Sequence, residues 1–247
     1  MFESINPAVR PHPYANLVLI VILCVITFFS YAPVLKNHFI NFDDPEHIIE
    51  QPLVKSLSLD NLSKIFSTNV NTTYIPLTML SFAVEYHFFK LNPFIYHLDN
   101  LFMHLGVVSL VFLFCIELRL NRLTAFTAAL LFGLHPMHVE SVAWATERKD
   151  VLYTLFYLSS MLVYLKFLNL ERRKVYYVLA LILGFFSMLS KPIAVSLPLV
   201  LLLIDFLKGR TDIKQCLIDK IPFLLYIIPL AKLTHAENAS AYVVDPS

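Results

Sequence analysis

Long apolar stretches are the feature that most constrains what this chain can fold into. The first runs from Ala15 to Leu35 without a charged residue. A bilayer core about 30 Å thick is crossed by a helix of about 20 apolar residues. The stretch exceeds the roughly 7 to 15 apolar residues of a signal peptide, and cleavage after Ala32 would leave Pro33 as the first residue. We therefore predict a retained membrane-spanning helix.

Six further stretches are apolar enough to be helices in a membrane, although some are short. They are Leu98 to Leu118, Thr124 to His135, Val151 to Leu168, Val175 to Leu189, Ile193 to Leu207 and Ile221 to Leu233. Only 15% of the residues are charged, against about 25% in soluble domains. The prediction is an all-α, polytopic membrane helix bundle with about seven transmembrane helices, forming one membrane domain over residues 1–247.

Charge and motifs exclude several other classes of protein. The net charge of +1 gives no basic surface for the phosphates of a nucleic acid, so no nucleic-acid partner is expected. Neither GxGxxG nor GxxxxGK[ST] occurs, so no soluble nucleotide-binding loop is predicted. The three cysteines lack evident partners for a disulfide framework.

The orientation of the bundle follows from lysine and arginine, which favour the cytoplasmic side. One alternate set of connections holds ten of them: Arg119, Arg122, Lys166, Arg172, Arg173, Lys174, Lys208, Arg210, Lys214 and Lys220. The short connections of the other set hold four: Arg148, Lys149, Lys191 and Lys232. We therefore predict a cytoplasmic N-terminus. The outer side then carries a first loop over 36–97, a second over 135–150, the turn at Lys191, and the start of a further loop over 234–247.

The first outer loop is predicted to contain interfacial helices. Asn61 to Phe66 is expected to begin a short helix with Asp60 as its N-cap. Ile75 to Leu91 is apolar and aromatic but carries Glu85, which suits a helix lying at the membrane surface. Such helices are able to cover a cavity at membrane level.

An acidic group opens this loop. Asp43, Asp44 and Glu46 follow closely on the first span, around Pro45. One interpretation is a solvated helix end that Pro45 terminates. The other is a general base, because neighbouring carboxylates at a membrane have divergent proton affinities and one of them can accept a proton from a hydroxyl nucleophile.

The second outer loop combines His135, His138 and Glu140. This is not the HExxH arrangement of zinc sites, and Pro136 disfavours a regular helix through both histidines. Divalent ions prefer carboxylate oxygens, so a metal is compatible with the acidic residues, but nothing in the sequence requires a cofactor. The alternative is an interfacial loop anchored by its tryptophan.

Basic residues in outward segments run against the usual charge distribution. Arg148 and Lys149 lie in the second outer loop, and Lys191 lies between two apolar stretches. Lys191 by itself also fits a side chain that extends to the interface. Together the three cations predict a site for an anionic group such as a lipid phosphate. Earlier in the chain, His97, Asn100 and His104 share one helix face and are expected to pack inside the bundle.

These segments resemble a known family, the bacterial relatives of the transmembrane and tetratricopeptide-repeat O-mannosyltransferases, in the GT-C glycosyltransferase superfamily. The motifs are Asn41-Phe42-Asp43-Asp44, Tyr74-Ile75-Pro76-Leu77-Thr78, His135 to Ala143, Glu147 to Leu152 and Ser190-Lys191-Pro192. The resemblance covers Asn41 to Asp205 and is most specific over His135 to Leu152. It implies a GT-C multi-pass fold, a polyprenyl-phosphate sugar donor and transfer to a protein hydroxyl. It also implies that Asp43 and Asp44 form the catalytic acidic pair.

The predicted reaction is a single inverting displacement outside the cytoplasm, in which a sugar such as mannose passes to a Ser or Thr hydroxyl of a protein. Arg148, Lys149 and Lys191 are assigned to the donor phosphate. The residues expected to orient the substrates are His135, His138, Glu140 and Glu46. The motifs suggest a bacterial inner membrane, and an endoplasmic-reticulum location would keep the same sidedness.

The chain departs from the family in two respects, and other functions stay open. Family members have more membrane helices and often tetratricopeptide repeats, whereas this chain stops in a predicted outer loop and has no repeat of about 34 residues. We therefore expect it to be truncated relative to the family. The alternatives are transfer to a lipid or polysaccharide, or a non-catalytic transport or assembly subunit, although no internal repeat of the transporter kind is evident.

Overall fold

The computed structural model describes residues 13–71, 73–170 and 172–241, and every regular element in these ranges is helical. The long and medium helices are α1 (Pro13–Tyr31), α4 (Pro93–Glu117), α5 (Arg122–Gly133), α7 (Arg148–Asn169), α8 (Lys174–Ser190), α9 (Leu197–Leu207) and α11 (Ile221–Ala241). Each predicted apolar stretch corresponds to one of them. The prediction of an all-α fold is confirmed.

Three helical segments are long and apolar enough to cross a membrane. They are Tyr14–Lys36, Pro93–Glu117 and Arg148–Asn169. The helical segments Arg122–Gly133, Lys174–Ser190 and Pro192–Leu207 are apolar but shorter. The topology of about seven spans therefore stays a prediction.

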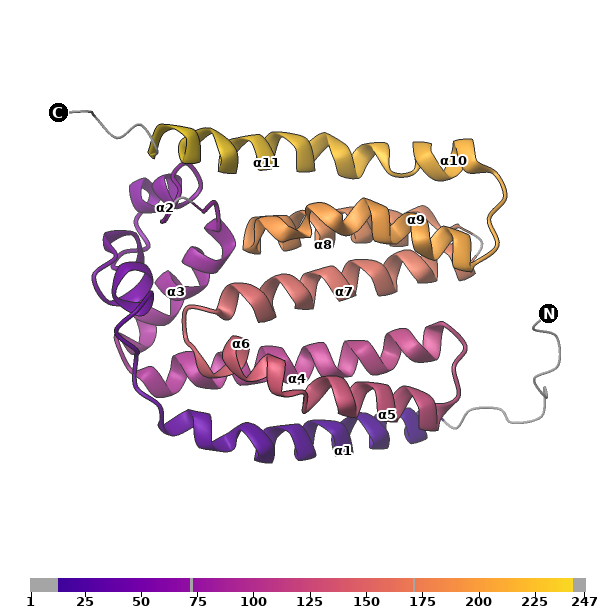
Figure 1. Cartoon of the computed structure of the whole chain (residues 1–247), viewed down its shortest axis with the longest axis horizontal. Helices are drawn as coiled ribbons and strands as arrows, with labels where there is room; N and C mark the ends of the chain where they lie inside the picture. The colour runs from indigo at the N-terminus through magenta and orange to yellow at the C-terminus, as the bar shows by residue number, and fades with distance from the viewer. Residues whose placement is uncertain (1–12, 72, 171, 242–247) are drawn as a thin grey trace.

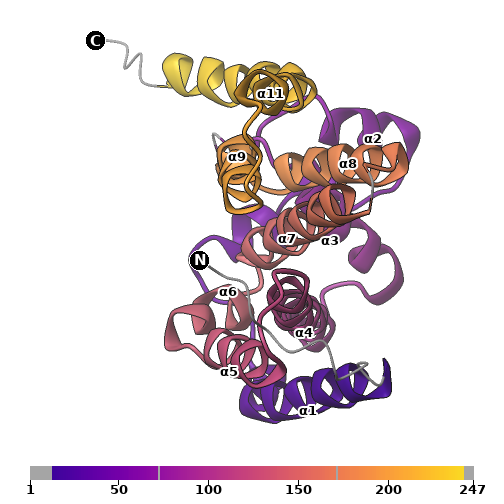
Figure 2. The same cartoon turned by 90° about the vertical axis from the view of Figure 1, so that its right-hand side faces the viewer.

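The helices run side by side in one bundle (Figure 1). Seen along their axes, α1, α4 and α5 form one group, while α7, α8, α9 and α11 form the other (Figure 2). Leu23, Phe112 and Ala129 are in the core of the first group, and Tyr164 and Leu201 are in the core of the second. Helices α4 and α7 join the two groups by packing against each other.

The segments predicted to face outward gather at one end of the bundle (Figure 1). The first of them forms η1 (Ala32–Lys36), η2 (Pro45–Ile49), η3 (Pro52–Val54), α2 (Leu59–Ile65) and α3 (Pro76–Phe89). The second forms η4 (Pro136–His138) and α6 (Val139–Ala143). Thr78 joins them to the third, since its hydroxyl donates to the carbonyl of Ser190 at 3.0 Å. The three segments lie at the same end of the bundle, as the prediction that they share one side of the membrane requires. Which side of the membrane this end faces stays a prediction.

Several predicted boundaries are wrong by a few residues, because local capping decides where a helix begins. Helix α4 begins at Pro93 rather than after residue 97, since the side chain of Asn92 accepts from the Phe94 N–H at 3.2 Å. Ser58, and not Asp60, caps α2. The second outer loop ends at Glu147, because Arg148 to Asp150 belong to α7. Residues 234–241 continue α11, while 242–247 lie outside the described residues.

The opposite end of the bundle is closed by a buried ionic network. Asp205, which is 1% exposed, accepts hydrogen bonds from Tyr164 at 2.8 Å and Arg210 at 2.9 Å, and it also pairs with Lys220. Arg210 forms a second ion pair with Asp219 at 2.8 Å. Two of the cations used to predict orientation are therefore also structural, and they hold the α9–α11 connection against α7.

Gly184 lets α8 approach its neighbours closely. A Cβ atom at this position would lie 2.5 Å from the Tyr226 hydroxyl and 2.7 Å from Leu197 Cδ2. Gly184→Ala is therefore expected to lower the unfolding free energy by about 1 to 3 kcal/mol, as overpacking does. Thermal unfolding in detergent measures this change. Gly106→Ala is the control, because its Cβ would meet only the movable Leu155 side chain, at 3.0 Å; equal stability of the two variants would contradict the close packing.

Candidate active site

Asp44 ties the first outer loop to the second. It is 1% exposed, and its Oδ1 accepts from Trp144 Nε1 and the Thr146 N–H, both at 3.0 Å, as well as from the Thr146 hydroxyl. Its Oδ2 accepts from the Ile40 N–H at 2.8 Å. A buried carboxylate that accepts four hydrogen bonds cannot easily leave these partners. Asp44 is therefore placed as an anchor between the loops.

Asp43 lies beside this anchor but faces a pocket. Its side chain is 30% exposed, and the pocket has a volume of about 270 Å³. The other lining residues are His47, Asn71, Thr73, Ile75, Lys149 and Lys191. The neighbouring carboxylates are thus divided by the fold, with one buried and one accessible.

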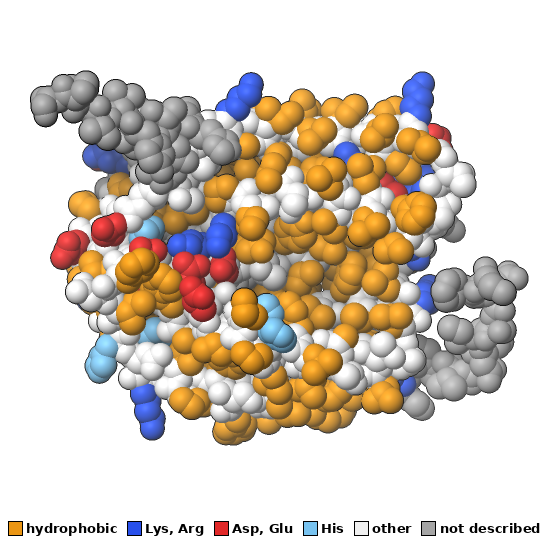
Figure 3. Space-filling view, in the orientation of Figure 1, with side chains coloured by type: hydrophobic (Ala, Val, Ile, Leu, Met, Phe, Trp, Pro, Cys, Tyr) orange, Lys and Arg blue, Asp and Glu red, His pale blue; other side chains and the backbone are white. Residues whose placement is uncertain are grey.

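Two lysines from other parts of the chain reach this pocket. Lys149 lies in the first turn of α7, and Lys191 directly follows the end of α8. Lys149 Nζ lies 3.9 Å from Asp43 Oδ2 and 2.8 Å from Glu147 Oε1, while Lys191 pairs with Asp150 and lies 3.9 Å from Glu147 Oε2. Burial raises the pKa of Glu147. Acidic and basic side chains gather on this part of the surface, whereas hydrophobic side chains cover most of the helices beyond it (Figure 3). The group offers two ammonium ions whose carboxylate partners an incoming anion can replace.

The structure does not place Arg148 in this group, contrary to the prediction that it joins Lys149. Consecutive residues in a helix point about 100° apart, so the two side chains diverge once α7 begins at Arg148. The guanidinium is 0% exposed and ion-paired to Glu85 at 2.5 Å. It also donates to Asn100 Oδ1 at 2.8 Å and to the Tyr96 carbonyl at 3.0 Å. This position suits packing of the outer loop against α4 and α7.

Glu85 and Asp99 give this buried arginine two acidic neighbours. The three residues line a separate, largely apolar pocket of about 280 Å³. Burial and the adjacent Asp99 raise the pKa of Glu85 to about 8, against the favourable charge of Arg148. Burial therefore opposes the charged form of Glu85, and the ion pair with Arg148 favours it.

The four predicted orienting residues are separated by the fold. His138 lines another pocket of about 280 Å³, which borders the charged group. His135 is exposed and its Nδ1 accepts from the Met137 N–H at 3.3 Å, so it caps η4. Glu140 is exposed and lines neither pocket. Glu46 is also exposed and accepts from Asn71, a lining residue of the Asp43 pocket.

Sequence reasoning missed other residues that complete the site. His47 is 3% exposed and its Nδ1 lies 3.0 Å from the Asp43 carbonyl, while burial lowers the pKa of its imidazole. Asn71 and Thr73 line the same pocket as Asp43, and only the tertiary structure brings them there. Glu147 and Asp150 directly flank Arg148-Lys149 in the sequence. Their position beside two cations is a pattern from which ion pairs at the site could be predicted. No group of three or more His, Cys, Asp or Glu within the described ranges is arranged to hold a metal ion.

Comparison with known proteins identifies the family. The dolichyl-phosphate-mannose-protein mannosyltransferase family matches residues 98–235. The chain belongs to this mannosyltransferase family. The resemblance to O-mannosyltransferases of the GT-C superfamily is thereby confirmed, and the family together with three candidate spans indicates a membrane protein.

Individual relatives of this mannosyltransferase-family chain carry related names. Protein O-mannosyl-transferase F38B6.6 of Caenorhabditis elegans is 30% identical over 257 residues, covering 95% of this chain and 35% of the relative. Protein O-mannosyl-transferase TMTC3 of Mus musculus is 40% identical over 94 residues, covering 38% of this chain and 10% of the relative. The chain thus spans about a third or less of the length of these relatives. No solved structure matches it significantly.

Proposed function

We propose that the chain carries the active site of an inverting mannosyltransferase, which moves a hexose from a polyprenyl-phosphate donor to a Ser or Thr hydroxyl of a protein. The observation that carries this proposal is the pocket in which Asp43 meets Lys149 and Lys191. These residues come from three separate segments, and they combine an accessible carboxylate with two ammonium groups. Membership in the mannosyltransferase family supports the donor and the acceptor class.

Asp43 is the general base in the proposed reaction. The acceptor oxygen attacks the anomeric carbon while its proton passes to the Asp43 carboxylate. The bond between that carbon and the phosphate oxygen breaks, and the electron pair leaves with the lipid phosphate. Lys149 and Lys191 stabilise the charge that develops on this phosphate. Asp44 holds the loop of Asp43 in place through Trp144 and Thr146.

The same proposal places the pocket on the extracytoplasmic side of a membrane, with about seven helices crossing it. Among the short connections, those at the end of the bundle that carries the pocket hold fewer cations, in line with the tendency of positive charge to stay inside. A bacterial inner membrane and the endoplasmic reticulum both satisfy this sidedness. The variant Lys64→Cys tests this sidedness. Its new thiol is labelled with a membrane-impermeant reagent in sealed vesicles of known orientation.

Lys191→Met tests the assignment of the lysine to the donor. We expect transfer of labelled mannose from a polyprenyl-phosphate donor to a Ser/Thr peptide to fall about 10- to 100-fold, because one of two partly exposed cations is lost. The assay uses membranes containing the chain, with the amount of protein measured in parallel. Lys64→Met is the control, since Lys64 is an exposed lysine on α2 that pairs with the exposed Asp60 and lines none of the pockets described above.

An unchanged rate in Lys191→Met would contradict the phosphate-binding role. Absence of transfer by the wild type, followed by its appearance with a longer chain of the same family, would place part of the active site outside this sequence. Transfer only to a lipid or polysaccharide acceptor would keep the mechanism and replace the protein acceptor.

A further inference from the structure

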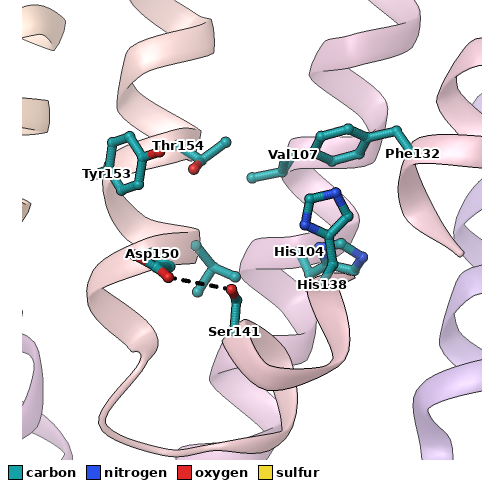
Figure 4. Close-up of a pocket in the computed structure, with 9 residues that line it drawn as sticks. His104, Val107, Phe132, His138, Ser141, Asp150, Tyr153 and Thr154 are labelled. Atoms are coloured by element: carbon teal, nitrogen blue, oxygen red, sulfur yellow. Dashed lines mark hydrogen bonds between the residues drawn. The ribbon is translucent and has the colours of Figure 1, made fainter. Parts of the chain in front are cut away.

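A second pocket lies next to the pocket of Asp43, and no part of either substrate has been assigned to it above. It measures about 280 Å³. In Figure 4, His138 and Phe132 lie on one side, and Thr154 and Tyr153 of α7 lie on the other, with Asp150 and Ser141 at the base. Residues from α4, α5, η4, α6 and α7 therefore form its wall.

One ion pair separates the two pockets. Asp150 lines the second pocket and pairs with Lys191, which lines the first. The other carboxylate oxygen of Asp150 accepts from the Ser141 hydroxyl at 3.3 Å. A molecule that fills the second pocket and extends past Asp150 therefore reaches the lysine and the pocket of Asp43.

The lining of the second pocket suits a neutral ring that carries hydroxyl groups. Ser141, Tyr153 and Thr154 supply hydroxyls, and Asp150 supplies a carboxylate. None of the described residues that line it is a lysine or an arginine, so the pocket offers no permanently cationic partner for a phosphate. Burial and the nearby His135 lower the pKa of His138, which leaves a neutral imidazole able to donate and accept.

The size of the pocket narrows the choice further. Its volume is close to the lower end of the roughly 300 to 1,000 Å³ of small-ligand sites, which suits a single ring and excludes a whole lipid chain. Phe132 and Val107 give it an apolar wall against which the carbon face of a sugar can lie.

We propose that this second pocket binds the hexose ring of the lipid-linked donor, with Asp150 and Thr154 holding its hydroxyl groups and its anomeric carbon directed toward the pocket of Asp43. This assignment rests on the proposed function. It places the phosphate at Lys191 and Lys149, on one face of the anomeric carbon, and the acceptor hydroxyl approaches from the opposite face. Asp150 then acts as a positioning residue that contacts both Lys191 and the sugar.

Loss of one hydroxyl contact tests the pocket. Thr154→Val is expected to lower kcat/KM for the mannosyl donor about 3- to 10-fold, because one neutral hydrogen bond is lost. The same variant is expected to lose most of the preference of the wild type for mannosyl over deoxymannosyl donors, which a purely structural effect would leave in place. Thr127→Val is the matched control, since Thr127 is an exposed threonine on α5 outside the pocket.

A binding experiment separates this inference from the proposed reaction. A polyprenyl-phosphate donor with a photoreactive diazirine on its hexose is cross-linked to the chain in membranes, and the labelled peptide is mapped by mass spectrometry. Labelling within 132–141 or 150–154 supports the pocket, even in the absence of transfer, in which case only the proposed reaction fails. Labelling confined to 43–75, or no labelling while transfer proceeds, overturns the assignment of the hexose to this pocket. An unchanged donor preference in Thr154→Val also overturns it.

Discussion

Asp43→Asn is expected to lower the rate of mannose transfer by about 10²- to 10⁴-fold, the range for loss of a general base. The amide cannot accept the hydroxyl proton, yet it has nearly the same size and keeps the place of the side chain in the pocket. Asp43 is 30% exposed and lies 3.9 Å from Lys149, so its replacement leaves no buried charge without a partner. Transfer from a polyprenyl-phosphate donor is measured against the amount of folded protein in the membrane.

Two further variants distinguish loss of the base from a general effect of replacing an aspartate. Asp60→Asn changes an exposed aspartate on α2, which is paired with Lys64, and should transfer as the wild type does. Asp44→Asn should lower the amount of folded protein, because both carboxylate oxygens accept from N–H donors and the amide nitrogen would face a donor in either orientation. A transfer rate within a few-fold of the wild type in Asp43→Asn would show that the base is another group.

Arg148→Met is expected to lower the unfolding free energy by about 3 to 5 kcal/mol, because it leaves the buried Glu85 without its cation. The guanidinium also lies 4.6 Å from the centroid of the Phe82 ring and donates to Asn100 and to the Tyr96 carbonyl. The outer loop would lose its main polar connection to α4. Thermal unfolding of the purified protein in detergent measures the loss.

The double variant Arg148→Met with Glu85→Leu distinguishes a lost ion pair from general disruption. Replacing both buried partners by apolar side chains is often nearly neutral, so much of the stability should return. Arg148→Lys should stay destabilised, since an ammonium cannot reproduce the fork of donors. If Arg148→Met instead unfolds like the wild type but loses transfer, the arginine acts on the donor phosphate, as its position in the sequence first indicated.

The sequence determined the helical elements and the grouping of their ends. Runs of about 20 apolar residues leave the backbone no partners in a bilayer except its own, so helices follow from composition alone. The alternation of these helices then brings residues 36–92, the loop of His138 and the turn of Lys191 to one end, as the structure has them. The acidic pair and the basic motif were recognisable for the same reason, because polar groups are few in such a chain.

Only the tertiary structure decided which of these polar groups meet. Asp43 and Asp44 are neighbours in sequence, yet Trp144 and Thr146, about a hundred residues away, bury one and leave the other in a pocket. Arg148 and Lys149 diverge because α7 begins between Glu147 and Arg148, which no local pattern fixed. Contacts between distant segments depend on how whole helices pack, and a single sequence does not encode that packing in any local window.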